Sequence, residues 1–142
     1  MGDRDGTLPI LQFRPGAVKD AVIQLGNGTS YIIVSGLILD GINGTNDVVK
    51  ITQDSGAPNG SNHIRLQNCQ IVNAYDNGIL ISDVNGTAQC YHVEVLDCSI
   101  HDNRGLGASG GAHYHGIYTE SSYGLFVGND MSRDPLAPAE SA

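Results

Sequence analysis

The sequence predicts an all-β fold in which short strands wind into a solenoid of stacked coils. A nine-residue phrase occurs twice, at residues 63–71 and at residues 92–100, with a spacing of 93 − 64 = 29 residues. Its apolar positions, its Asn or Asp and its cysteine (Cys69, then Cys98) recur in the same order. Glycine is also abundant, with 19 among 142 residues, and often follows Asn, Asp or Gly, which is typical of turns. A repeat of this length indicates units that bury their apolar faces only by stacking.

In chain order, the first two apolar runs are residues 8–13 and residues 21–25, each closed by a turn that contains glycine. Residues 32–39 are an upstream copy of the phrase, at a distance of 64 − 32 = 32 residues. A weaker copy at residues 125–129 begins 125 − 93 = 32 residues after Val93. Because side chains alternate along a strand, the alignment predicts three inward columns. They are Ile32/Ile64/Val93/Leu125, Val34/Leu66/Val95/Val127 and Leu39/Ile71/Ile100.

A further strand repeats between the copies, at residues 49–51, 79–81 and 117–119, and each follows a turn. Each repeat therefore holds three short strands, which describes one coil of a parallel β-helix with coils about 4.8 Å apart. We expect about four such coils in one domain, residues 1–130, and a proline-rich tail at residues 131–142.

Composition excludes several classes of partner. A net charge of −8 leaves no electrostatic footprint for nucleic acid or for an anionic membrane. No segment approaches the roughly 20 apolar residues of a membrane span, and residues 1–5 lack the apolar stretch of a secretory leader. We therefore expect either a cytosolic protein or one from which a leader has been removed. Three cysteines do not suggest a disulfide framework; we expect Cys69 and Cys98 as stacked buried thiols and Cys90 in a loop.

The coils, with the phrases at residues 6–10, 30–37, 100–103 and 115–118, resemble right-handed parallel β-helix proteins of the pectate lyase-like type. The resemblance extends from about residue 6 to residue 129 and includes alginate lyases and chondroitin-degrading enzymes. It implies a secreted or cell-surface bacterial protein that acts on acidic polysaccharide or oligosaccharide. Such proteins usually begin with a capping helix and have many more coils. We therefore expect a fragment of a longer solenoid, or a homo-oligomer that covers the coil ends.

A polysaccharide lyase acting by β-elimination needs a base, a group that neutralises the uronate carboxylate, and an acid for the leaving oxygen. The candidate catalytic residues are His101, Arg104, Tyr118 and Lys50. Basic and aromatic groups of this kind converge on the flank shared by the glycine-rich insertion at residues 104–113 and the outward column Lys50/Leu80/Tyr118. The candidate substrate-binding residues on the same flank are Asp102, His113, His115, Glu120 and Tyr75.

Other interpretations of the same residues stay open. His101, His113 and His115 suggest zinc, but His115 shares a column with Asp47 and Asn77, where polar side chains close turns, so no metal site is expected. No cofactor is expected either, with calcium left open because the resembling lyases often use it. The alternative to a lyase is a non-catalytic binding, adhesive or structural module, so the sequence does not decide whether the chain is an enzyme.

Overall fold

The computed structural model describes residues 7–16, 21–53, 59–83, 90–103, 115–120 and 122–131, and within these ranges it contains strands and no helix. Every strand pair in this part of the chain is parallel. The strands are β1 (Ile10–Gln12), β2 (Ala21–Gly26), β3 (Ser30–Ser35), β4 (Ile38–Asp40), β5 (Asp47–Gln53), β6 (Asn62–Gln67), β7 (Gln70–Val72), β8 (Ile79–Asp83), β9 (Tyr91–Leu96), β10 (Ser99–His101), β11 (Ile117–Thr119) and β12 (Ser122–Val127).

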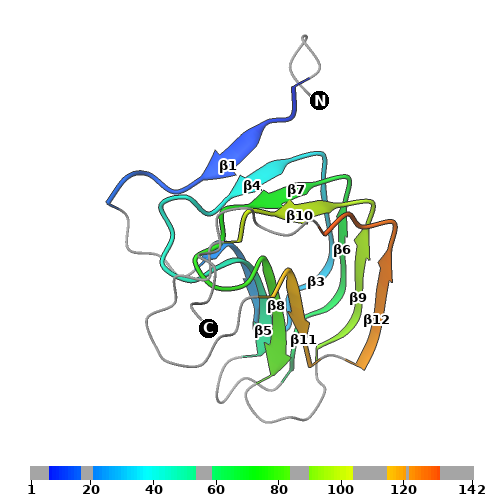
Figure 1. The fold of residues 1–142 in the computed structure, drawn as a ribbon. Helices are drawn as coiled ribbons and strands as arrows, with labels where there is room; N and C mark the ends of the chain where they lie inside the picture. The colour runs from blue at the N-terminus through cyan, green and yellow to red at the C-terminus, as the bar shows by residue number, and fades with distance from the viewer. Residues whose placement is uncertain are drawn as a thin grey trace, which may run out of the picture.

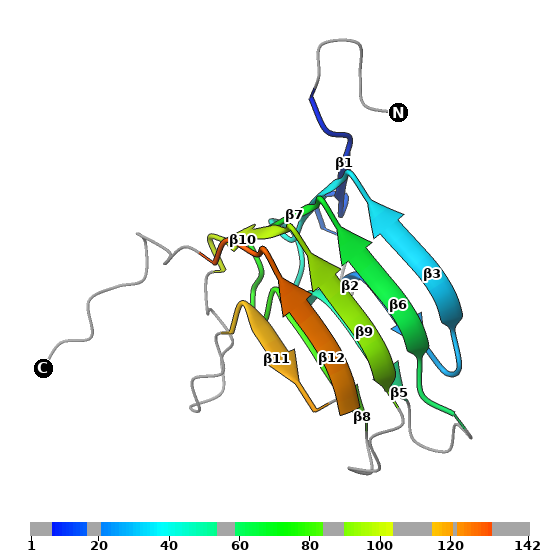
Figure 2. The same cartoon turned by 90° about the vertical axis from the view of Figure 1, so that its right-hand side faces the viewer.

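The strands form three four-stranded sheets, with the orders β1-β4-β7-β10, β11-β8-β5-β2 and β12-β9-β6-β3. Successive strands along the chain belong to different sheets, so the path returns to the same sheet three times (Figure 1). The predicted all-β parallel solenoid is confirmed, at about three turns rather than the four coils expected. Figure 2 looks onto the sheet of β3, β6, β9 and β12, whose strands lie side by side along the solenoid axis.

The core is a set of apolar columns inside the coils, as the repeat predicts. Ile64 pairs with Val93 and Leu66 pairs with Val95 across β6 and β9, and all four side chains are at most 1% exposed. Their columns continue to Ile32 and Val34 on β3. A third column, Leu39, Ile71 and Ile100, is equally buried. Because each apolar side chain is covered by its counterpart on the next coil, burial arises from stacking rather than within one repeat.

The predicted register of the last copy is wrong by one residue. Gly124 pairs with Val93 and Phe126 with Val95, so these two occupy the inward columns. Leu125 pairs instead with Glu94 and lies on the outward face. A shift of one residue moves every side chain of a strand to the opposite face. The apolar run at Leu125 suggested the wrong alignment because the inward position beside Val93 carries no side chain.

The cysteine prediction is confirmed for two residues and corrected for the third. Cys69 and Cys98 are each 2% exposed on neighbouring coils, where Ser99 N–H donates to the Cys69 carbonyl. Cys90 lies outside the strands, as predicted, but it is only 1% exposed. Its thiol faces the carbonyl oxygens of Ile51 and Ser82 at 3.9 and 3.5 Å. It therefore belongs to the core and is no accessible loop residue.

Both ends of the described solenoid expose apolar side chains. At the first coil Ile10 is 61% exposed, and at the last coil Val127 is 53% and Met131 is 60% exposed. Apart from Met131, the predicted tail lies outside the described residues.

Candidate functional site

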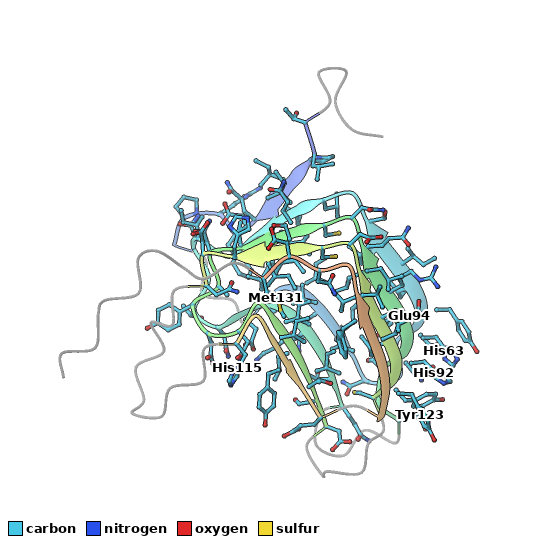
Figure 3. The ribbon with its side chains drawn as sticks, turned by 45° about the vertical axis from the view of Figure 1, so that its right-hand side comes forward. His63, His92, Glu94, His115, Tyr123 and Met131 are labelled. Carbon is cyan, nitrogen blue, oxygen red and sulfur yellow. The ribbon has the colours of Figure 1, made fainter. Side chains whose placement is uncertain are left out.

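A row of four rings crosses the outer face of the sheet formed by β3, β6, β9 and β12. Tyr31, His63, His92 and Tyr123 each come from the second residue of one of these strands. The ring centroids are 4.6 Å apart between Tyr31 and His63, where the rings stack with an interplanar angle of 16°. They are 4.7 Å apart between His63 and His92, and 5.8 Å between His92 and Tyr123. We call this set the ring row; Figure 3 shows three of its members outside the sheet.

All four residues of the ring row have a left-handed backbone. Their φ angles are 59° at Tyr31, 53° at His63, 53° at His92 and 63° at Tyr123. For a residue with a Cβ this conformation costs about 1–2 kcal/mol, and it is least unusual for Asn, Asp and His. The bulky tyrosines at both ends therefore hold an unfavourable conformation that recurs once per coil. Backbone strain of this kind is concentrated at functional sites, where the surrounding structure maintains it.

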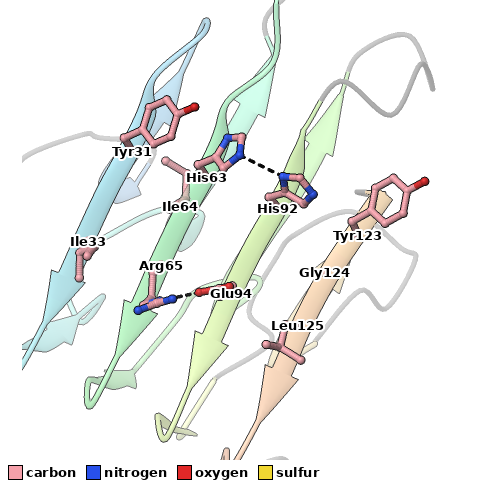
Figure 4. A pocket seen from close by; sticks show the side chains of 10 residues that line it. All are labelled: Tyr31, Ile33, His63, Ile64, Arg65, His92, Glu94, Tyr123, Gly124 and Leu125. Carbon is pink, nitrogen blue, oxygen red and sulfur yellow. Dashed lines mark hydrogen bonds and ion pairs between the residues drawn. The ribbon is translucent and has the colours of Figure 1, made fainter.

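The ring row lines a groove of about 750 Å³ (Figure 4). The groove is also lined by Ile33 and Leu125, and by Arg65 and Glu94, which form an ion pair between neighbouring strands. The sequence predicts this pair because the two positions correspond in the repeat, and β6 and β9 pair in that register. Two imidazoles, two phenols, one guanidinium and one carboxylate thus face solvent beside apolar side chains.

The predicted catalytic flank forms a smaller hollow on a different sheet. Lys50, Leu80 and Tyr118 lie in register on β5, β8 and β11, as predicted, and line a cavity of about 270 Å³. Lys50 Nζ lies 3.5 Å from Oδ2 of Asp47, a carboxylate that is 1% exposed. Asp47 Oδ1 accepts hydrogen bonds from the backbone and side-chain amides of Asn77. Lys50 is therefore a counter-ion within the coil, and its catalytic role stays a prediction.

Tyr118 interacts with two of the predicted substrate-binding residues. Its hydroxyl donates to Glu120 Oε1 at 3.0 Å, and its ring lies 5.7 Å from the ring of His115. The hydrogen bond to Glu120, together with the negative charge of that carboxylate, raises the pKa of the Tyr118 phenol. This direction disfavours the phenolate, which is the form that a tyrosine base requires.

Of the remaining predicted site residues, those that the structure describes do not line this hollow. His101 Nδ1 lies 2.6 Å from Asp102 Oδ2 at the end of β10, so these two residues pair with each other. Tyr75 lies in the turn between β7 and β8, where its backbone N–H donates to the Asn46 carbonyl. Arg104 and His113 lie outside the described residues.

Neither a metal site nor a membrane span is found in the part of the chain that the structure describes. No three His, Cys, Asp or Glu side chains there are grouped so as to hold a metal ion. His115 N–H donates to Asn77 Oδ1. His115 therefore lies in the column of turn-closing polar residues that the sequence predicts. Among these same residues, no helix has the length and apolar character needed to cross a bilayer.

Comparison with known proteins finds no matching family model, no matching curated protein and no matching solved structure. The assignment of a parallel solenoid therefore rests on the strand geometry alone. The lyase-like part of the resemblance has no relative to support it.

The sequence contains a pattern that points to three members of the ring row and, once the register of the last copy is corrected, to the fourth. His63 and His92 open the repeated phrase, and Tyr31 and Tyr123 precede the other two copies at spacings of 63 − 31 = 32 and 123 − 92 = 31 residues. These positions lie at the edge of the phrase, outside the inward columns that define the core. In the register that the structure shows for the last copy, an aromatic or imidazole residue lies at the same position of every copy, and the packing of the core does not explain this pattern.

Proposed function

We propose that the chain is a carbohydrate-binding solenoid segment that holds a polysaccharide along the ring row. The observation that carries this proposal is the repetition of one ring per coil in a continuous groove, at spacings of 4.6, 4.7 and 5.8 Å. A row that crosses four strands suits an extended ligand with repeated units better than a compact small molecule.

The chemistry of the groove suits a sugar chain. Sugar units have polar hydroxyl edges and apolar C–H surfaces, and tyrosine and histidine likewise combine an apolar ring body with polar atoms. Ile33 and Leu125 add apolar surface beside the rings. Tyr31 and Tyr123 are 76% and 79% exposed, so their rings are available to a ligand.

Binding assays with two tyrosine variants test the proposal. Oligosaccharides from alginate, pectate and chondroitin, and a neutral glucan, are titrated into the protein by calorimetry. Tyr31→Ala and Tyr123→Ala should each weaken binding about tenfold, which corresponds to about 1.4 kcal/mol. Tyr118→Ala is the matched control, because it removes a tyrosine from another sheet. Equal losses in all three variants, or no binding to any of the polymers, would contradict the proposal.

A polysaccharide lyase acting by β-elimination is the second candidate. The observation in its favour is that an imidazole (His92), a phenol (Tyr123) and a guanidinium (Arg65) line the same groove. These are the types of group that could take the proton, protonate the leaving oxygen and neutralise the uronate carboxylate. Incubation with acidic polymers, with and without calcium, should then produce ultraviolet absorbance from an unsaturated product, and His92→Ala should abolish it. Oligosaccharide binding without any rise in absorbance favours the non-catalytic module.

A further inference from the structure

A chain of hydrogen bonds runs through the ring row. Asn62 Nδ2 donates to the Gly60 carbonyl oxygen at 3.2 Å. Asn62 Oδ1 lies 2.8 Å from His63 Nδ1. His63 Nε2 lies 3.1 Å from His92 Nδ1, as the dashed line in Figure 4 shows.

The backbone carbonyl at the start fixes the direction of every later bond. The Gly60 oxygen can only accept, so the amide nitrogen of Asn62 must face it and Oδ1 must face His63. Oδ1 also can only accept, which places a proton on His63 Nδ1. In the neutral ring, His63 Nε2 is then a lone pair, and the proton between the two imidazoles belongs to His92 Nδ1.

The last nitrogen of this chain faces the groove. With its proton on Nδ1, neutral His92 carries a lone pair on Nε2. Figure 4 shows this second nitrogen on the side of the ring turned away from His63 and toward Tyr123. His92 is exposed and lines the groove, and Nε2 has no hydrogen-bond partner among the described residues.

We propose that His92 Nε2 is the fixed hydrogen-bond acceptor of the groove, directed there by the positioning residues Asn62 and His63, and that it binds a hydroxyl group of the saccharide. This inference rests on the proposed function for its ligand, whereas the state of the imidazoles belongs to the protein alone. A fixed acceptor selects a hydroxyl donor at that point of the sugar and rejects an ether or a carboxylate oxygen, because two acceptors would face each other.

Nitrogen-15 NMR of the imidazole rings tests the assignment in the free protein. At a pH where both rings are neutral, His92 should show a protonated Nδ1 and an unprotonated Nε2, and His63 should show the same form. Asn62→Ala removes the group that orients the chain, so both rings should move toward the Nε2–H form. Asn62→Asp retains an acceptor oxygen and should preserve the Nδ1–H form. A proton on His92 Nε2 in the unaltered protein, or no change in Asn62→Ala, would overturn the inference.

Titration with an oligogalacturonate, and with a neutral oligoglucan, tests whether a saccharide hydroxyl binds to His92 Nε2. A sugar hydroxyl that donates to His92 should shift the Nε2 resonance toward that of a hydrogen-bonded nitrogen, and His92→Ala should weaken binding about tenfold. Binding in calorimetry without a shift at Nε2 overturns the acceptor role and leaves the proposed function standing. No binding of either probe overturns the acceptor role, even if the imidazole forms are as expected, and the proposed function is refuted as well only if the alginate and chondroitin oligosaccharides also fail to bind.

Discussion

At the residue scale, the sequence predicts the inward positions well and the outward ring row poorly. Leu66 and Val95 could be assigned to the core because alternation and repetition agree there, and both are fully buried. The left-handed backbone of Tyr31 and Tyr123 has no comparable pattern, because tyrosine is not a residue that favours positive φ. That conformation recurs at the same strand position in each coil, and it becomes visible only in the folded chain.

Cys90 is a second residue whose environment the sequence did not predict. Its burial leads to a prediction of how the stability of the protein depends on pH. A lone cysteine before a strand gives no periodic pattern, yet the fold buries it. Burial, with a smaller contribution from the charge of Asp83, raises the pKa of the Cys90 thiol. The folded chain therefore holds this proton more tightly than the unfolded chain, whose thiol titrates near pH ~8.5. The contribution of the protonated Cys90 thiol to the stability of the fold is fully present below about pH 8.5 and is lost as the pH rises through the folded pKa.

Denaturant unfolding between neutral and alkaline pH measures this effect. The free energy of unfolding should fall above about pH 8.5, and Cys90→Ala should reduce the slope of that fall. The slope is compared rather than the absolute stability, because the substitution also leaves a small cavity. An unchanged slope in Cys90→Ala would show that the Cys90 thiol does not titrate differently in the folded and unfolded chains.

At the element scale, a turn of the same kind recurs at the same place in every coil, as the strands do. The bend that follows β3, β6, β9 and β12 is made in each coil by one residue with positive φ: Gly36 at 66°, Asn68 at 52°, Asp97 at 51° and Gly128 at 69°. Gly, Asn and Asp are the residues that adopt this conformation at least cost, which explains why one of them stands at this position in every coil. The register of β12 could not be predicted from such a preference. A Cβ at Gly124 would lie 2.5 Å from the Phe126 ring, so this ring occupies the space that a side chain at Gly124 would need.

Two glycine substitutions test whether stacking restricts the turns. Gly36→Asn should change the free energy of unfolding by less than about 0.5 kcal/mol, because a Cβ at Gly36 would have no atom within 4 Å and Asn68 holds the same conformation one coil later. Gly78→Ala should cost about 1–3 kcal/mol, because its Cβ would lie 2.6 Å from the Gly116 carbonyl oxygen. Chemical denaturation measures both variants. Similar costs for the two would show that stacking between coils does not restrict these turns.

At the scale of the whole molecule, the two candidate sites lie on the outer faces of two different sheets of the solenoid. The ring row lies on the sheet of β3, β6, β9 and β12, whereas Lys50 and Tyr118 lie on the sheet of β2, β5, β8 and β11. Figure 3 shows His115 on the far side of the coil from His63 and His92. The sequence pointed to the face of Lys50 and Tyr118, because a long insertion and several histidines lie near it in the sequence. On the face of the ring row, the repeated ring position lies at the edge of each copy, outside the inward columns that define the core.

Deleting residues 105–112 distinguishes the two faces. These residues connect β10 with β11 along the chain, and neither strand belongs to the sheet that carries the ring row. Solenoids tolerate changes in turns while their inward columns survive, and we expect the deletion to leave the free energy of unfolding nearly unchanged. If the ring row is the binding site, the oligosaccharide affinity measured by calorimetry should also be unchanged, while Tyr31→Ala still weakens it. A loss of affinity in the deletion variant, with full affinity in Tyr31→Ala, would instead assign binding to the flank of Lys50 and Tyr118.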